Sequence, residues 1–232
     1  MGFVLTLLCT HLSSFVGRSY IGMPGPSVPH WPIPGLVSIP VIGPVLFDHN
    51  ALVYLSYVLV IGTWFWISHT RMGLTLRAIG ERPEAAHSRG YDVNRLRYLY
   101  TAVGGALVGL AGAAYSLDVK LGWSHRHTAG MGWIALAIVI FGGWHPFRVA
   151  FGAVLFGALK SLGTFLQPIY PSVPSQVFQA APFALMILAL LLVSDPVQER
   201  LSRYLPPRAW RAVSGILSGR APAALGRRFQ KS

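Results

Sequence analysis

The chain has 232 residues, of which 53% are hydrophobic and only 11% are charged, against about 25% charged in a typical soluble domain. Because the charged residues cluster and leave long tracts without charge, the composition excludes a soluble fold and indicates a membrane protein with several spans. The formal net charge of +12 does not indicate nucleic-acid binding, because the basic residues lie in blocks beside apolar tracts, where membrane topology explains them.

Six apolar segments follow one another along the sequence. The first, about 2–16, is shorter than the roughly 20 residues with which a helix spans a bilayer. The others cover about 50–68, 98–117, 129–144, 148–166 and 176–194. They predict an all-α membrane helix bundle with about five to six spanning or re-entrant segments. We expect residues 1–195 to form one transmembrane domain and residues 196–232 to form a basic tail.

The first residues of the chain resemble the interior of a helix and not its start. No positively charged segment precedes the first apolar run, so a cleavable signal peptide is not indicated. We therefore expect an N-terminally truncated chain that lacks upstream helices. The stretch 22–44 is too rich in proline for one long helix, and it is interpreted either as an external loop that contacts a partner or as a plain connector.

Basic residues predict the orientation of the chain in the membrane. Cytoplasmic segments carry an excess of Lys and Arg, so the loop 70–97 and the tail after residue 195 are expected in the cytoplasm. The loops then expected outside, 17–49, 118–128 and 167–175, carry only three basic residues. The cytoplasmic set comprises Arg71, Arg77, Arg82, Arg89, Arg95 and Arg97 in the loop and Arg200, Arg203, Arg208, Arg211, Arg220, Arg227, Arg228 and Lys231 in the tail.

The fourth apolar segment, about 129–144, is short and bracketed by glycines. It is interpreted either as a simple span or as a broken, re-entrant helix. Non-helical backbone at membrane depth requires cover by protein or by a water-filled cavity.

The loop 70–97 contains a predicted short, charged helix over 83–89. Pro83 is favoured in a first helical turn, and Glu84 suits a helix N-terminus. Ala85 and Ala86 are strong helix formers, and Gly90 suits a helix end. Such a short, rigid helix between two spans is a good lever, because it can fit a groove of a partner and move as a unit.

The segment Glu84-Ala85-Ala86-x-x-x-Gly90 resembles the coupling motif of ABC importer permeases, in which this loop docks on the nucleotide-binding subunit. Three blocks in order, 76–90, 104–112 and 132–142, extend the resemblance and are similar to the simple-sugar and nucleoside permease group. Branched-chain amino-acid permeases are similar in the first two blocks. The resemblance covers about residues 70–195.

The resemblance implies that Glu84, Ala85, Ala86, Arg89 and Gly90 couple the chain to an ATP-binding-cassette ATPase subunit. It also implies a second permease subunit, in a homo- or heterodimer, and an extracytoplasmic solute-binding protein, at a bacterial-type inner membrane. ATP and magnesium are expected on the ATPase subunit, and no cofactor is expected on this chain. The implied function is import of a nucleoside or a simple sugar.

The sequence contains no motif for chemistry on this chain. The stretch 152–157 and Lys160 lack the Gly-Lys pair that a phosphate-binding loop requires. Cys9 is the single cysteine, and His125 and His127 lack a third ligand nearby, so no metal site is expected. No serine, histidine and carboxylate arrangement for catalysis stands out. We therefore expect a transport subunit without catalytic residues.

Polar and aromatic side chains in the apolar segments are candidates for the translocation pathway. Lys160 is one because an ionisable residue in a membrane helix is a functional candidate by default. Gln176 and Gln179 can bond sugar hydroxyls or base edges, and Trp133 can stack on a sugar or base. Alternatively, Lys160 snorkels or pairs with a carboxylate of a missing helix, and the other three are packing or interface residues.

Two other functions compete with nucleoside or sugar import. A branched-chain amino-acid ABC permease carries a carboxylate cargo, for which Lys160 is a suitable cation. A secondary transporter or channel works without an ATPase. In the tail, Trp210, Val213, Ile216 and Leu217 are interpreted either as a short amphipathic helix at the inner membrane surface or as part of a disordered basic tail near anionic lipid.

Overall fold

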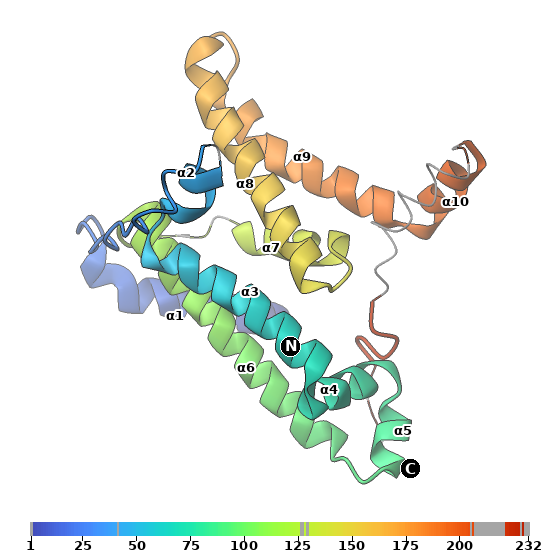
Figure 1. Cartoon of the computed structure of the whole chain (residues 1–232). Helices are drawn as coiled ribbons and strands as arrows, with labels where there is room; N and C mark the ends of the chain where they lie inside the picture. Colours follow the sequence, from blue (N-terminus) through green and yellow to red (C-terminus); the bar gives the residue numbers. More distant parts are fainter. Residues whose placement is uncertain are drawn as a thin grey trace. The chain divides into compact units, whose positions relative to one another are not determined.

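The computed structural model describes residues 2–40, 42–125, 128, 130–204, 206, 221–227 and 229. Helices follow one another through these residues, and no β-strand occurs among them, which confirms the predicted all-α class (Figure 1). The predicted helix around residues 210–217 lies outside this range. The chain divides into two compact units, Met1–Leu59 with Arg95–Ala129 and Val60–Asn94 with Gly130–Ser232, which are described separately.

Three helices of the described residues are long and apolar enough to cross a membrane. They are α3 (Ala51–His69), α6 (Val93–Ala114, continued to Lys120 by a π-helical segment η2, Tyr115–Lys120) and α8 (Pro146–Ile169). They correspond to the predicted segments 50–68, 98–117 and 148–166. Helix α6 begins five residues earlier than predicted because arginine has a high helix propensity, so Arg95 and Arg97 do not stop the helix.

The proline-rich stretch of the first unit folds back against residues 47–49, which follow it in the chain. It follows α1 (Gly2–Gly17) and the short helix η1 (Arg18–Tyr20), and it leads into α2 (Ile42–Phe47). The Trp31 and Ile33 amides donate to the His49 and Phe47 carbonyl oxygens at 3.1 and 3.2 Å. These bonds satisfy backbone groups that proline-rich sequence cannot pair within a helix. The stretch is therefore an ordered loop.

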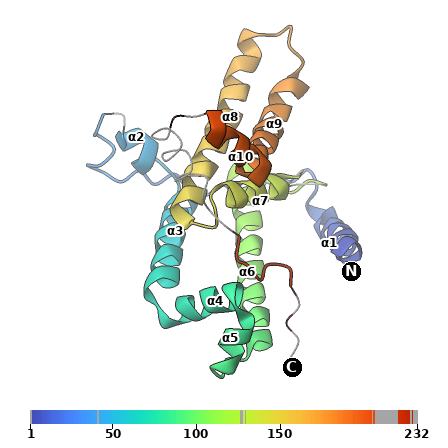
Figure 2. The same ribbon diagram turned by 90° about the vertical axis from the view of Figure 1, so that its right-hand side faces the viewer.

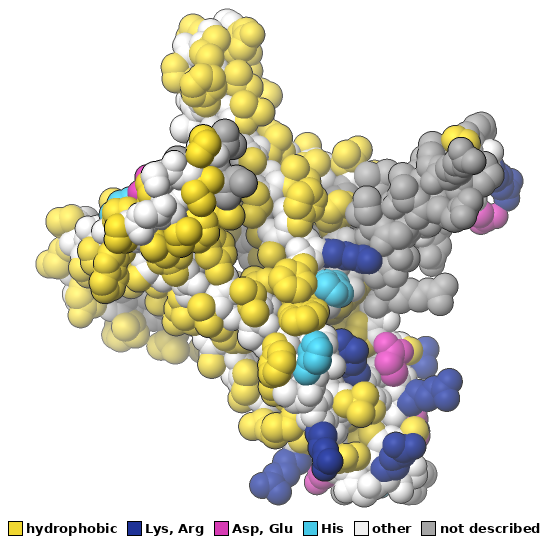
Figure 3. All heavy atoms as spheres, viewed as in Figure 1, with side chains coloured by type: hydrophobic (Ala, Val, Ile, Leu, Met, Phe, Trp, Pro, Cys, Tyr) yellow, Lys and Arg dark blue, Asp and Glu magenta, His cyan; other side chains and the backbone are white. Residues whose placement is uncertain are grey.

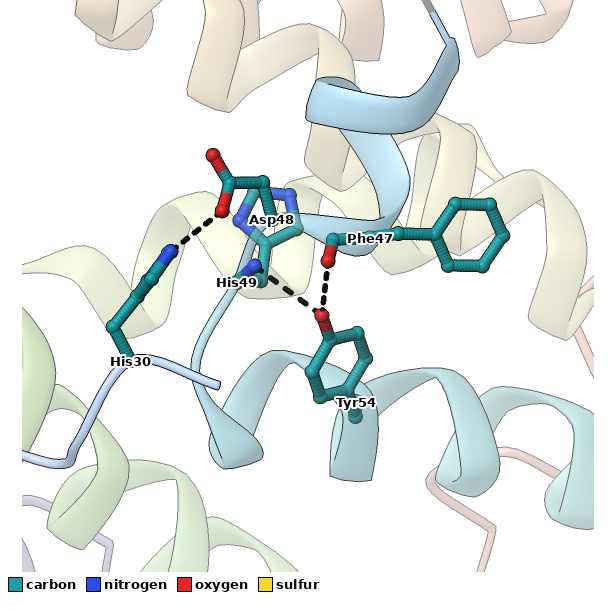
Figure 4. A network of polar contacts seen from close by, with 5 residues as sticks. All are labelled: His30, Phe47, Asp48, His49 and Tyr54. Carbon is teal, nitrogen blue, oxygen red and sulfur yellow. Dashed lines mark hydrogen bonds and ion pairs between the residues drawn. The ribbon is translucent and has the colours of Figure 1, made fainter. Parts of the chain in front are cut away.

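Side chains hold the same loop in place (Figure 4). The His30 Nε2 and Asp48 Oδ1 atoms lie 2.6 Å apart. The Tyr54 hydroxyl, on α3, donates to the Phe47 carbonyl at 2.6 Å and accepts from the His49 amide at 3.3 Å. The Tyr54 contacts tie the segment before α3 to the first turn of α3, and the His30–Asp48 contact holds the proline-rich loop against that segment.

The second unit contains a small apolar core between α7 (Met131–Phe141), α8 and α9 (Ser175–Val193), which precede α10 (Asp195–Tyr204). Ile134, Ile138 and Phe156 are buried at its centre. Helix α7 has 11 residues, so it is about 16 Å long, against a hydrocarbon thickness of about 30 Å. As a helix, the predicted fourth segment therefore covers about half of a bilayer.

The turn between α7 and α8 depends on two glycines. The Gly143 amide donates to the Ile140 carbonyl at 3.1 Å and the Trp144 amide donates to the Val139 carbonyl at 3.2 Å, which is the Schellman arrangement for ending a helix. Gly143 has φ 61°. A Cβ added to Gly142 would lie 2.8 Å from the Val149 backbone nitrogen, so the turn also requires the absence of a side chain there.

Replacing Gly142 should test this close approach. We expect Gly142→Ala to destabilise the second unit by about 1–3 kcal/mol, because an added Cβ meets backbone that cannot rotate away. The matched control is Gly157→Ala in α8, whose added Cβ has no atom within 4 Å and whose helix propensity improves. Thermal unfolding in detergent should show a lower midpoint for the first variant alone. Equal midpoints for both variants would contradict this packing.

Candidate functional site

Two short helices, α4 (Arg71–Glu81) and α5 (Pro83–Ser88), form the connection between α3 and α6 (Figures 1 and 2). Helix α4 begins because the Thr70 side chain accepts a hydrogen bond from the Gly73 amide at 3.0 Å. A Cβ on Gly73 would lie 2.3 Å from the Trp66 carbonyl oxygen. Gly73 therefore allows α4 to turn back closely on the end of α3.

Helix α4 is not among the elements predicted from the sequence of this loop. The signal that identifies it is Thr70, an N-cap residue directly before an apolar pattern in which Met72, Leu76 and Ile79 recur at helical spacing. Ile79, the last of these, is only 3% exposed. The arginines of the same stretch also contribute to the basic excess that predicts the membrane orientation.

The predicted helix over 83–89 is confirmed as α5, which has a defined start and a defined end. Pro83 occupies its first turn, and Arg82 is the one residue between α4 and α5. At its end the Gly90 amide donates to the His87 carbonyl at 2.8 Å and the Tyr91 amide donates to the Ala86 carbonyl at 3.2 Å. This is again the Schellman arrangement, with Gly90 at φ 87°.

Helix α5 has a buried face and an exposed face. Pro83 and Ala86, three residues apart, are buried, and Ala86 is 3% exposed. Four residues, which we call the outer face of α5, are exposed: Glu84, Ala85, Ser88 and Arg89. With 3.6 residues per turn they lie on the side opposite the buried pair. Of the predicted coupling residues, Glu84, Ala85, Arg89 and Gly90 are therefore accessible to a partner, whereas Ala86 holds α5 in place.

Charged side chains gather over α4 and α5 in the space-filling view (Figure 3). Basic and acidic residues are interspersed there, whereas apolar side chains dominate the view over α3 and α6. The exposed charged residues of this region are Arg71, Arg77, Glu81, Arg82, Glu84 and Arg89. The region has the character of a water-facing surface.

The predicted pathway residues lie on three different helices of the second unit. Trp133, on α7, is 69% exposed, and Lys160 on α8 and Gln176 on α9 are also exposed. The side chain of Gln179 lies outside the described residues. No hydrogen bond or ion pair joins Trp133, Lys160 and Gln176 in the part of the chain that the structure describes. Each of the three is open to lipid, to an aqueous cavity or to another subunit.

The described residues contain no cluster of three His, Cys, Asp or Glu side chains arranged to hold a metal ion. His127 lies outside these residues, and His125 contacts Ser14, with 2.9 Å between His125 Nδ1 and the Ser14 Oγ. His125 is thereby part of the packing of α1 on the segment after α6. Within these described residues, the structure adds no metal-binding candidate to the predicted coupling and pathway residues.

Comparison with known proteins gives a family match along most of the chain. A family model described as the permease component of branched-chain amino acid transport systems matches residues 12–190. A putative glucose ABC transporter permease protein of Haloferax volcanii is 39% identical over 165 residues, which are 69% of this chain and 50% of that relative. No solved structure matches the chain significantly.

Two further relatives are named for nucleosides. A guanosine ABC transporter permease protein of Bacillus subtilis is 37% identical over 164 residues, which are 68% of this chain and 50% of the relative. A nucleoside ABC transporter permease protein of Lactococcus lactis is 36% identical over 166 residues, which are 70% of this chain and 52% of the relative. The chain spans about half the length of the curated relatives it matches.

Proposed function

The chain belongs to the family of branched-chain amino acid transport system permease components, and we propose that it is a transmembrane permease subunit of an ATP-driven ABC importer for a small polar solute. The proposed cargo is a nucleoside or a simple sugar. This choice is supported by the relatives named for guanosine, nucleosides and glucose, each at least 36% identical to this chain.

The observation that carries the proposal is the construction of α5. A six-residue helix, started by Pro83 and ended by Gly90, presents a mostly polar, exposed outer face on one side and is held in place by the buried Ala86 on the other. We propose that the outer face of α5 docks in a groove of an ATP-binding-cassette ATPase subunit, which binds ATP and magnesium. The motion of that subunit on ATP hydrolysis would then reach α3 and α6 through α4 and α5.

In the proposed topology the loop 70–97 and the C-terminal tail face the cytoplasm of a bacterial-type cell, and the protein lies in its inner membrane. The excess of arginine in these segments supports this orientation. The proline-rich loop then faces outward, where an extracytoplasmic solute-binding protein delivers the cargo. A second permease subunit, either identical or related, completes the pathway beside Trp133, Lys160, Gln176 and Gln179.

A branched-chain amino-acid cargo is the second candidate, favoured by the description of the matching family and by the cation of Lys160. Uptake into proteoliposomes that contain the reconstituted complex separates the candidates. We expect unlabelled guanosine or glucose, and not leucine, to compete with the transported solute. Competition by leucine alone would replace the proposed cargo, and uptake that continues without ATP would indicate a secondary transporter or channel.

Charge reversal on α5 tests the docking itself. We expect Glu84→Arg to weaken co-purification with the ABC ATPase encoded nearest to the gene of this chain at least about tenfold, or about 1.4 kcal/mol, because it replaces an exposed charge of the outer face. The control is Glu81→Arg, which makes the same charge change at an exposed position of α4. Binding that is unaffected by Glu84→Arg would show that α5 is only a connector.

A further inference from the structure

The C-terminal residues 221–227 and 229, which we call the strap, contact helices α4 and α5. The Ala224 amide donates to the Gly80 carbonyl oxygen of α4 at 2.9 Å, and Ala224 is only 8% exposed. The backbone of the strap forms two turns there. The Leu225 amide donates to the Pro222 carbonyl at 2.9 Å, and the Arg227 amide donates to the Ala224 carbonyl at 3.1 Å. This is an ordered contact, formed by residues about 140 positions apart in the chain.

The contact with α4 uses a backbone group that the helix itself leaves unpaired. The last four carbonyl groups of a helix have no partner within it, and Gly80 belongs to the last turn of α4. The strap supplies the missing donor through Ala224. A Cβ added to Gly80 would lie 3.3 Å from the Pro222 Cβ, so the glycine lets the strap lie directly on the helix.

The strap also reaches α5. The rings of Phe229 and His87 meet edge to face, with their centroids 5.3 Å apart. Between the two contacts lies Arg82, the single residue that joins α4 to α5, with φ −142° and ψ 82°. The strap thus contacts the helix before this joint and the helix after it, while the outer face of α5 stays exposed.

We propose that the strap is a positioning element that holds α4 and α5 at a fixed angle across Arg82, so that α5 passes the motion of the ATPase subunit to α4 without bending at the joint. The inference rests on the proposed function, in which the outer face of α5 is the docking site. Gly80, Ala224 and Phe229 are the residues that carry it. Loss of the strap leaves docking intact and reduces the transport obtained from each ATP.

Cross-linking tests the contact without any ATPase subunit. Cys9 is the single cysteine, so a Cys9→Ser chain is a background for new cysteine pairs. We expect a short thiol cross-linker to join the pair His87→Cys and Phe229→Cys in native membranes. The control pair is Ala85→Cys and Phe229→Cys, because Ala85 lies about 200° around α5 from His87. Absence of the first cross-link, or equal yield for both pairs, overturns the proposal.

The function of the strap is tested by the ratio of solute transported to ATP hydrolysed in the reconstituted complex. We expect this ratio to fall at least about fivefold for Phe229→Ala and for Gly80→Leu, with unchanged co-purification of the ATPase subunit. Phe229→Tyr keeps an aromatic ring and should restore coupling. Ala78→Leu, at an exposed position of α4 two residues from Gly80, is the control that should leave the ratio unchanged.

The two proposals fail in different ways. If the unaltered chain does not bind the ATPase subunit, the proposed function fails, whatever the cross-linking shows. If the unaltered chain binds and transports while Phe229→Ala and Gly80→Leu keep the full ratio, only the strap proposal is overturned. A loss of ATPase binding in Phe229→Ala would also overturn it, because the strap would then belong to the docking surface instead of the joint.

Discussion

Gly90→Val is expected to abolish most of the ATP-coupled transport while the protein still inserts into the membrane, whereas Gly90→Asn should retain it. Gly90 has φ 87°, a left-handed conformation that costs a residue with a side chain about 1–2 kcal/mol and a β-branched residue more. Asparagine tolerates this conformation far better than valine does. The two variants therefore separate backbone strain from the mere presence of a side chain.

The effect should be large because α5 is too short to be stable by itself. Isolated helices of fewer than about 12–15 residues are marginal in water, and α5 has six residues. It depends on the two hydrogen bonds that Gly90 and Tyr91 donate to its last turn. Strain of about 1–2 kcal/mol at Gly90 would reduce the population of intact helix by a factor of about 5–30.

Solute uptake and limited proteolysis of the loop together check this prediction. Gly90→Val should show low uptake and faster cleavage near α5, and Gly90→Asn should resemble the unaltered protein in both. No atom lies within 4 Å of a Cβ added at Gly90, so steric crowding cannot explain a difference between the two variants. Equal uptake by both variants would show that the shape of the α5 end is irrelevant to coupling.

Lys160→Met is expected to reduce uptake at least about tenfold while raising the stability of the protein. Lys160 is residue 15 of the 24 in α8, close to the middle of an apolar helix. A charged side chain at such a depth costs about 2.5–3.5 kcal/mol on insertion scales, so its removal should stabilise the fold. A pathway role for Lys160 therefore predicts that Lys160→Met raises the stability of the protein. A structural role predicts that the same substitution lowers it.

Thermal unfolding in detergent and uptake in proteoliposomes provide the two measurements. Lys160→Arg keeps the charge and is expected to keep a substantial part of the uptake, which makes it the matched control. Unchanged uptake in Lys160→Met would remove Lys160 from the pathway. A lower unfolding midpoint in that variant would indicate that Lys160 is held by an acidic partner and stabilises the bundle.

Local signals explain which parts of the fold were predictable. The apolar segments were located because membrane helices need long runs without charge, and α3, α6 and α8 lie at the predicted places. Helix α5 was predictable because Pro83 lies in its first turn and Gly90 follows directly after its last turn. Helix α4 was missed because its basic residues were interpreted only as orientation signals, although Thr70 is an N-cap in the sequence itself.

The sequence by itself determined the membrane class of the protein, the long apolar segments that form α3, α6 and α8, and the two ends of α5, because each of these depends on residues that are neighbours in the chain. Only the tertiary structure decided that Ala86 faces inward and that Gly80 accepts a hydrogen bond from Ala224. The position of the strap depends on the Gly80 carbonyl left open at the end of α4, on the space above this glycine and on the ring contact between Phe229 and His87. Composition and residue spacing do not predict a contact between residues 80 and 224. This contact forms only when α4 and the end of the chain meet in space.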